Sequence, residues 1–243
     1  MSNDEDINME YDYWKRTDAQ RGAAWDFVVN AAHPDIALLQ EVHPDHLMHS
    51  MYDLHYHKGY HEKNWGSAIL SKKYPYFQVN FDGFYEGKNG LLCYEFQVTD
   101  KKRLTVINMY GKIDAEGYAT TTMHHMLSDL TPILGKKRKS RSIVLGGDLN
   151  VSTQWDQRYP NKYPSHKIVF DRLDDFKLIN CTLAFFGKYV QTYSHDPVSF
   201  PWQNDYIFIS KDLKPTFIDC KVYDDQKMLE LSDHFPLEIT LNI

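Results

Sequence analysis

The fold is decided by a stretch past the middle of the chain, Ser142-Ile143-Val144-Leu145-Gly146-Gly147-Asp148-Leu149-Asn150. Apolar and β-prone residues that are followed by two glycines are typical of a short buried strand. The glycines allow a sharp turn, so Asp148 and Asn150 can point the same way from the strand end while Leu149 turns into the core. Because α/β proteins carry their chemistry at such strand ends, the stretch predicts a polar site there. An ordinary strand followed by an Asx turn, without any functional site, would show the same sequence pattern.

The composition is that of a soluble globular protein, with 243 residues, of which 42% are hydrophobic and 25% charged. No stretch reads as a linker, an internal repeat or a low-complexity run, so residues 1–243 are expected to form one domain. Its three cysteines, Cys93, Cys181 and Cys220, form no close-spaced pair. This cysteine usage favours a reducing compartment.

The beginning of the chain, residues 1–10, is acidic and has neither the positive region nor the apolar core of a signal peptide. No apolar run approaches the roughly 20 residues that cross a bilayer. We therefore expect a monomeric cytoplasmic protein without a membrane span. The net charge of -6 argues against binding nucleic acid through the overall field, although a local positive groove could still bind it.

Hydrophobic periodicity predicts helices and strands that alternate along the chain. The expected helices cover residues 18–32, 116–134 and 164–176. The expected strands cover residues 35–41, 66–71, 77–81, 91–98, 104–110, 142–145, 182–190, 205–210, 215–222 and 235–243. In the second helix, Met123 and Met126 recur on one face with leucines, which indicates core filling rather than a cofactor site.

Two further features could suggest a function of their own. Six histidines fall between residues 43 and 61, namely His43, His46, His49, His55, His57 and His61. No cysteine accompanies them, so a polar surface helix and loop is favoured over a zinc site. The basic run at residues 136–141 could indicate a nucleic-acid-binding surface. However, it lies at the opposite end of the 142–145 strand from Asp148, about 20 Å away. It is expected to be a solvated turn.

Polar residues flank the expected strands in two sets. Four of them follow strands, namely Glu41, Tyr110, Asp148 and Asn150, whereas Asp205, Asp233 and His234 precede strands. If the second set runs antiparallel to the first, all seven side chains meet at one edge of the fold. Three carboxylates around a hard cation, with a histidine oriented by an aspartate, suit metal-assisted hydrolysis of phosphoesters.

The ordered set of motifs resembles the endonuclease/exonuclease/phosphatase superfamily. The motifs are Leu39-Gln40-Glu41, Trp65-Gly66-Ser67-Ala68-Ile69-Leu70-Ser71, Gly147-Asp148-Leu149-Asn150, Asp205-Tyr206-Ile207-Phe208-Ile209-Ser210 and Ser232-Asp233-His234. Each motif alone is weak evidence for the resemblance, but the ordered set is strong evidence and spans nearly the whole chain. The resemblance implies a four-layer α/β/β/α sandwich of two mixed β-sheets and phosphoester hydrolysis with Mg²⁺ or Mn²⁺.

The resemblance also implies roles for individual residues. Glu41 would be the main metal ligand with Asp233 assisting, and Asp148 would position or deprotonate the attacking water. Asn150 would hold the phosphate, and Tyr110 would touch it. His234, oriented by Asp205, would be the catalytic imidazole.

The N-terminal segment departs from the pattern of the superfamily. Its first strand is normally apolar and delivers an Asn to the metal site, whereas residues 3–7 here are mostly acidic or polar. Asn8 lies at a suitable distance ahead of Glu41. We therefore assign it to the position of that Asn, as a third metal ligand beside Glu41 and Asp233. A degraded first strand would lower stability or metal affinity.

The substrate class stays open at the level of sequence. This chain has Pro201-Trp202-Gln203-Asn204-Asp205-Tyr206, which lacks the Cys and Arg of inositol-phosphatase-like members, and no Lys soon after Gln40-Glu41 as in abasic-site endonucleases. A nuclease acting on DNA or RNA is the leading prediction, because nucleases are common among members of the superfamily that this chain resembles. The alternatives are a small-molecule or lipid phosphoesterase, which the acidic charge favours, and a catalytically silent binding module on the same fold.

Overall fold

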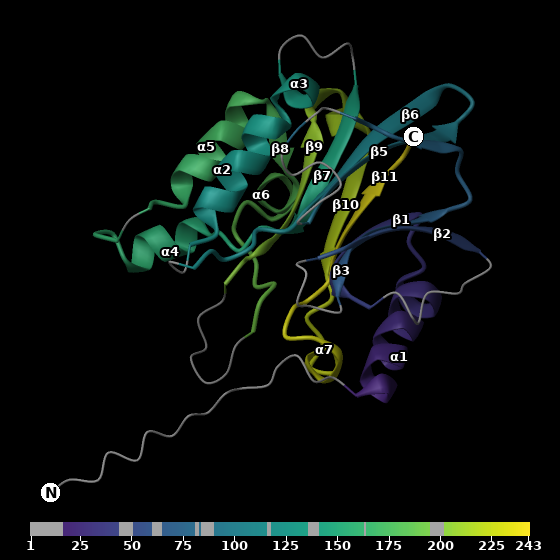
Figure 1. The fold of residues 1–243 in the computed structure, drawn as a ribbon, viewed down its shortest axis with the longest axis horizontal. Helices are drawn as coiled ribbons and strands as arrows, with labels where there is room; N and C mark the ends of the chain where they lie inside the picture. The colour runs from purple at the N-terminus through teal and green to yellow at the C-terminus, as the bar shows by residue number, and fades with distance from the viewer. Residues whose placement is uncertain are drawn as a thin grey trace, which may run out of the picture.

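A computed structural model describes residues 17–43, 51–59, 65–80, 83, 90–115, 118–135, 141–162, 164–194 and 202–243 (Figure 1). Asn8, three of the clustered histidines (His46, His49 and His61) and residues 136–140 of the basic run lie outside these ranges. Within them, two layers of strands lie face to face, and helices cover the outside of each layer.

The first sheet has six strands in the order β4-β5-β6-β7-β9-β8. These strands are β4 (Tyr76–Gln78), β5 (Leu91–Thr99), β6 (Lys102–Met109), β7 (Ser142–Asp148), β8 (Leu178–Asn180) and β9 (Asp205–Ser210). Strands β6 and β7 pair in parallel and the other neighbours pair antiparallel, so the sheet is mixed. The parallel pair makes β6 and β7 end at the same edge.

The second layer of strands is divided into two parts. One part is the antiparallel sheet β1-β3-β2, formed by β1 (Ile36–Val42), β2 (Tyr52–Lys58) and β3 (Gly66–Lys72). The other is the antiparallel pair of β10 (Phe217–Val222) and β11 (Leu237–Leu241). Both parts pack on the same face of the first sheet, through a core that includes Ile69 of β3 and Cys220 of β10.

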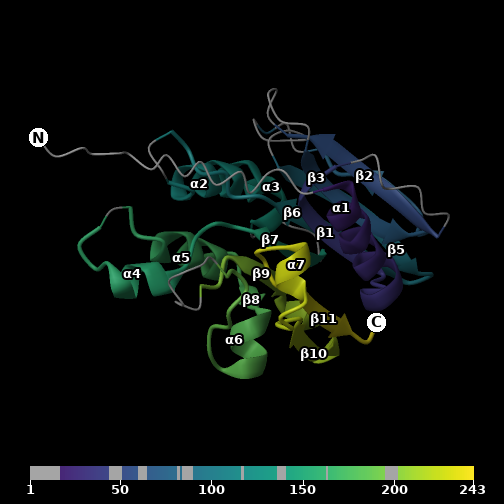
Figure 2. The same ribbon diagram turned by 90° about the horizontal axis from the view of Figure 1, so that it is seen from below.

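Helices form the two outer layers (Figure 2). The outer face of the first sheet is covered by α2 (Thr120–Asp129), α3 (Thr131–Leu134) and α5 (Lys167–Asp175). The outer face of β1-β3-β2 is covered by α1 (Asp18–Asp26) and by η1 (Phe27–Ala32), which continues it as a π-helix. The remaining helices are α4 (Thr153–Arg158), α6 (Cys181–Phe186), the 3₁₀ segment η3 (Lys211–Thr216) and α7 (Met228–Leu231). The expected α/β/β/α arrangement is confirmed, with its second strand layer divided.

The interior confirms the interpretation of the methionine-bearing helix. Met123 and Met126 are fully buried against the first sheet and touch no solvent. The expected helix over 116–134 is interrupted at Leu130, because Thr131 and Pro132 begin a new short helix.

Residues 182–190 were expected to be a strand, and this prediction is wrong. They contain most of α6, whose first turn is capped by the Asn180 side chain, which accepts a hydrogen bond from the Leu183 amide. Gly187 ends the helix in the left-handed conformation, with φ 67°. A short apolar run is equally compatible with a buried strand and a buried helix, so the caps decide.

The histidine-rich region also differs from the expected helix and loop. His55 and His57 lie on β2. His55 is buried against the rings of Tyr76, Tyr94 and Phe96, at centroid distances of 4.1, 4.5 and 5.5 Å. It is therefore a packing residue between the two strand layers.

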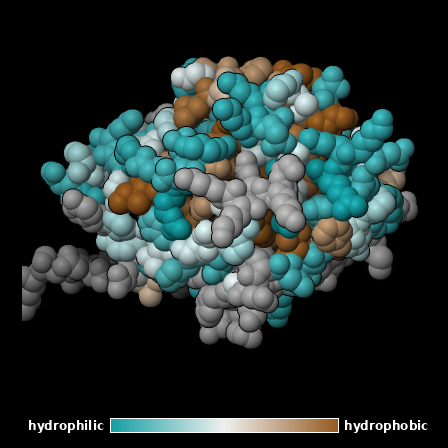
Figure 3. Space-filling view, turned by 90° about the horizontal axis from the view of Figure 1, so that it is seen from above, coloured by the Kyte–Doolittle hydropathy of each residue, from teal (hydrophilic) through white to brown (hydrophobic). Residues whose placement is uncertain are grey.

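The surface carries polar and apolar side chains intermixed on the face shown in Figure 3, which is mainly hydrophilic. None of the described helices is long and apolar enough to cross a membrane.

Candidate active site

The first pair of site residues is set by strand pairing. Asp148 is the last residue of β7 and lies opposite Asp205, the first residue of β9, in an antiparallel register. A strand that ends in an acid and a strand that begins with one thus place two carboxylates side by side. Gly147, in the strand just before Asp148, has φ 132°, and a Cβ there would lie 2.1 Å from the Met109 carbonyl oxygen. Glycine is therefore required at this point of β7.

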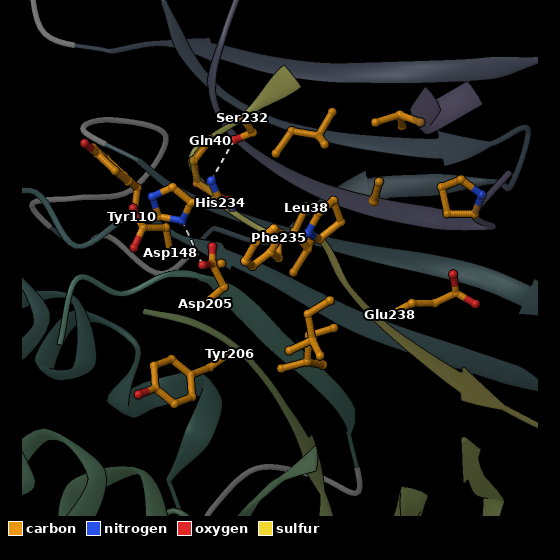
Figure 4. Close-up of a pocket in the computed structure, with 18 of the residues that line it drawn as sticks. Leu38, Gln40, Tyr110, Asp148, Asp205, Tyr206, Ser232, His234, Phe235 and Glu238 are labelled. Atoms are coloured by element: carbon orange, nitrogen blue, oxygen red, sulfur yellow. Dashed lines mark hydrogen bonds and ion pairs between the residues drawn. The ribbon is translucent and has the colours of Figure 1, made fainter. Parts of the chain in front are cut away.

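His234 joins this pair from the second strand layer. Its Nδ1 lies 2.8 Å from Oδ2 of Asp205, and its amide donates to the Ser232 hydroxyl at 3.0 Å. Asp205 is itself held because its own amide donates to the hydroxyl of Thr192 at 3.0 Å. Figure 4 shows the imidazole between Asp205 and Tyr110, beside Asp148. The histidine is thus oriented by Asp205, as the family resemblance implied.

Asn150 is directed at Asp148. Its backbone and side-chain nitrogens donate to the two carboxylate oxygens of Asp148, at 3.0 and 2.9 Å. The Asn150 backbone is left-handed, with φ 49°, which brings both donors onto one carboxylate. Leu149 between them is fully buried, as expected.

Glu41 lies at an irregularity of β1. The pairing of β1 with β3 shifts between Leu39 and Val42, and Glu41 adopts the left-handed region with φ 56°. Such a conformation is unfavourable for a residue with a side chain and is found mainly where function requires it. The Tyr110 hydroxyl donates to Oε1 of Glu41 at 2.5 Å, which fixes the carboxylate at the polar edge.

Beneath Glu41, a buried amide ties the two strand layers together. Asn108 of β6 is fully buried and donates to the carbonyl oxygens of Leu39 and Ala68, at 3.0 and 2.9 Å. Its own carbonyl oxygen accepts from Gln40 at 2.5 Å. The sequence analysis missed Asn108, although an amide inside the apolar run of β6 was a usable signal.

The electrostatics of the site are dominated by clustered negative charge. Burial raises the pKa of Asp148 to about 8, and the carboxylates of Asp205 and Glu41 act in the same direction. Burial alone would lower the pKa of His234, but the neighbouring Asp205 and Asp148 charges outweigh it and raise this pKa to about 10. Asp148 and Asp205 thus share one positively charged neighbour, His234, which they hold in its charged form.

The donor set fits a hard divalent cation. Among the described residues, side-chain atoms of Asp148, Asp205 and His234 lie within 4.8 Å of one another. The charged imidazole has no lone pair for a metal, so the carboxylates of this group are the possible ligands. Carboxylate oxygens are the ligands that Mg²⁺ and Mn²⁺ prefer, and a cation would offset the charge that raises the pKa of Asp148. Glu41 and Asp233 are outside this group but line the same cavity.

An aromatic wall lines the cavity on the α4 side. Trp155 stacks on His166 at a centroid distance of 5.8 Å and an interplanar angle of 12°, and it lies 5.9 Å from Trp202. The Ser152 amide donates to Nδ1 of His166, which orients the ring. Burial lowers the pKa of His166, so its ring favours the neutral form. No sequence signal separated these aromatic residues from ordinary core residues.

All but one of the predicted site residues lie along one cavity. The cavity is lined by Glu41, Tyr110, Asp148, Asn150, Asp205, Asp233 and His234. Asn8, the remaining one, is outside the described residues. The predicted meeting of two sets of strand ends at one edge is what the structure shows.

A sequence model of the Endonuclease/Exonuclease/phosphatase family matches residues 16–234. No curated protein sequence matches the chain. Several solved structures share its fold. An AP endonuclease from Leishmania major is 15% identical with a TM-score of 0.70, over 92% of this chain and 85% of that one. An AP endonuclease from Archaeoglobus fulgidus is 17% identical with a TM-score of 0.69, over 93% of this chain and 95% of that one. A 3' phosphatase from Neisseria, bound to a product DNA hairpin, is 15% identical with a TM-score of 0.72, over 93% and 95%.

Proposed function

Because this chain belongs to the Endonuclease/Exonuclease/phosphatase family, we propose that it is a divalent-metal-dependent phosphodiester hydrolase whose substrate is DNA or RNA. The observation that carries the proposal is the group formed by Asp148, Asp205 and His234, whose ligand atoms lie within 4.8 Å of one another. The similar folds of two AP endonucleases and a DNA-bound 3' phosphatase support nucleic acid as the substrate class.

In this proposal Asp148 positions the attacking water and accepts its proton. Burial and the neighbouring carboxylates raise its pKa to about 8, and a bound cation would lower this pKa again, so that the carboxylate is free to act as the base. Asn150 fixes both carboxylate oxygens of Asp148 and, with the second hydrogen of its side-chain amide, holds the phosphate.

His234 acts on the other side of the phosphate. Because Asp205 holds Nδ1, the Nε2 hydrogen of the charged ring is available for the phosphate or for the departing oxygen. Glu41, oriented by Tyr110, would hold Mg²⁺ or Mn²⁺ with assistance from Asp233. Such a cation, when bound, supplies charge neutralisation for the phosphate oxygens. Tyr110 also contacts the phosphate.

The remaining parts of the proposal concern the whole chain. We propose that residues 1–243 form one domain that acts as a monomer in the cytoplasm. A second candidate function, hydrolysis of a small-molecule or lipid phosphoester, is favoured by the net charge of -6, since a polyanionic nucleic acid is repelled by an acidic protein.

The test compares wild type, His234→Ala and the control His125→Ala, whose histidine lies on the exposed face of α2. Each protein is incubated with plasmid DNA, single-stranded oligonucleotides and bis-p-nitrophenyl phosphate, with Mg²⁺, with Mn²⁺ and with a chelator. We expect wild type and the control to cleave nucleic acid only with the metal, and His234→Ala to be inactive.

The other outcomes each redirect the proposal. Cleavage of the small diester alone would assign a substrate that is not nucleic acid. Ordinary activity of His234→Ala would remove the assigned site. Inactivity of the wild type on every substrate would leave a binding module on this fold.

A further inference from the structure

Two aromatic rings of α4 lead out of the catalytic cavity. Trp155 lines the cavity, and its ring centroid lies 4.5 Å from that of Tyr159, one helical turn further along. Both rings are half-buried, so each keeps part of its surface in solvent. Figures 1 and 2 place α4 at the periphery of the molecule, beside α5 and outside the strand layers. We call this pair of rings the α4 platform.

Hydrogen bonds fix the position of the platform. The Asp156 carboxylate accepts from the amides of His166 and Lys167, at 2.9 and 2.7 Å. The side chain of Gln154 accepts from the Gln203 amide at 2.9 Å. Helix α4 is thus tied to a segment that follows it and to the segment that precedes β9. A ligand that binds to a surface held in this way pays little for ordering it.

The platform is connected to the catalytic residues through a short piece of chain. Asn150, which holds the phosphate in the proposed function, is two residues ahead of Ser152, the cap of α4. The Ser152 amide donates to Nδ1 of His166, and Trp155 stacks on the same imidazole. Asn150, Ser152, His166 and Trp155 all line one cavity. A chain that extends from the phosphate on this side therefore passes over Trp155.

Two cations lie over the rings. The chain turns back after α4, where the Lys162 amide donates to the Tyr159 carbonyl oxygen at 3.0 Å. The Lys162 ammonium lies 5.8 Å from the ring centroid of Trp155 and 5.2 Å from that of Tyr159. The guanidinium of Arg158 lies 5.8 Å from the Tyr159 centroid. Both cations are exposed, so a protein with a net charge of -6 has a local positive surface beside its site.

This combination of rings and cations matches an unpaired nucleotide. Aromatic faces stack any base whose own faces are free, and neighbouring cations contact the phosphates. Inside a duplex the faces of each base are covered by its neighbours, so a single strand offers them far more readily. We propose that the α4 platform stacks an unpaired base next to the cleaved phosphate, while Lys162 and Arg158 contact phosphates further along. The substrate of the proposed function, on which this inference rests, is then single-stranded DNA or RNA.

The test measures binding of fluorescein-labelled chains of about twelve nucleotides, a length within the range that single-strand-binding folds cover. Fluorescence anisotropy is recorded with a chelator, so that nothing is cleaved. The ligands are oligothymidine, oligouridine, a DNA duplex and an abasic chain that has the phosphates without the bases. The tighter of the two homopolymers identifies DNA or RNA as the substrate. We expect the wild type to bind it more tightly than the duplex and the abasic chain.

The variants separate stacking from charge. Trp155→Leu keeps an apolar side chain against His166 but removes the aromatic face, so it should lose about 5–100-fold in affinity for the homopolymer and none for the abasic chain. Trp155→Phe should restore most of this affinity. Lys162→Ala should weaken binding of both chains alike and reduce the slope of log affinity against log salt by about 0.7. Phe77→Ala, an exposed aromatic of β4, is the matched control and should bind as the wild type does.

The results distinguish failure of the platform from failure of the proposed function. An equal loss on the homopolymer and the abasic chain in Trp155→Leu would overturn the stacking role and leave a nucleic-acid substrate in place. Tighter binding of the duplex than of either homopolymer would also overturn it. A wild type that binds none of the four ligands would overturn the nucleic-acid substrate itself, and the platform with it.

Discussion

The two strand layers are built from similar residues but differ in how completely they are buried. In the first sheet, Ile107 and Leu145 have no exposed surface, because paired strands flank β6 and β7 on both sides. In the second layer, Leu38 and Ile239 are equally apolar but half-buried, since β1 and β11 are edge strands that line the cavity of the site. Burial of an apolar strand residue thus depends on its neighbours as much as on its own side chain.

The active site draws residues from both layers. Asp148 and Asp205 come from the complete sheet, whereas Glu41 and His234 come from the divided layer. Asn108 is the buried link between them. The position of Glu41 and His234 relative to the two aspartates should therefore depend on the less complete half of the molecule.

The largest expected effect is a loss of turnover without a loss of stability, at a residue of the complete sheet. Asp148→Asn keeps the shape of the side chain but removes the base, so we expect turnover to fall about 10²–10⁴-fold. The free energy of unfolding should not fall, because the variant no longer buries a carboxylate whose burial raises its pKa. Steady-state kinetics and urea unfolding measure both, with the exposed Asp175→Asn as control. Wild-type turnover in Asp148→Asn would contradict the assigned role.

The next prediction compares truncations in the two layers. Leu145→Ala, in the complete sheet, should lower the free energy of unfolding by about 2–5 kcal/mol. Leu38→Ala, in the divided layer, should lower it by about 1–2 kcal/mol, because Leu38 is only half-buried. The exposed Ile168→Ala serves as control in the same urea titrations. An equal loss of stability in the two leucine variants would contradict the difference between the layers.

The sequence was most informative where a strand end and a polar residue coincide. Asp148 and Asp205 were expected to meet because one ends a strand and the other begins one, and their register confirms it. The family resemblance then predicted the layer architecture. The positions of the strands and the faces of their side chains could be predicted because side-chain alternation is a property of the local sequence.

What the sequence did not predict depends on contacts between distant residues. The left-handed φ of Glu41 and the link through Asn108 arise only when β1, β3 and β6 lie together. The helix that begins at Cys181 was mistaken for a strand because its caps, Asn180 and Gly187, were not weighed against a short apolar run.

A pH dependence of stability should come from the boundary between the two layers. Burial lowers the pKa of His55 below its ordinary value of 6.5, so the unfolded chain binds a proton that the folded chain resists. The free energy of unfolding should therefore decrease as the pH falls below about 6.5. His124 and His166, whose pKa values burial also lowers, add to this slope. His55→Phe should fold normally at pH 8 and show a shallower decrease in urea titrations, and parallel profiles for the two proteins would contradict this account.

The smallest expected effects come from one helix cap on each layer. Asn180 caps α6, which packs on β9 of the complete sheet, and Thr17 caps α1, which covers β1-β3-β2. Replacing either by alanine should cost about 1 kcal/mol. Asn180→Ala should lower the global free energy of unfolding by this amount, because α6 unfolds together with the sheet. Thr17→Ala should instead appear in hydrogen exchange as faster local opening of α1, since the divided layer can open without the first sheet. If Thr17→Ala also lowers global stability by the full amount, the two layers unfold as one unit through the core that they share.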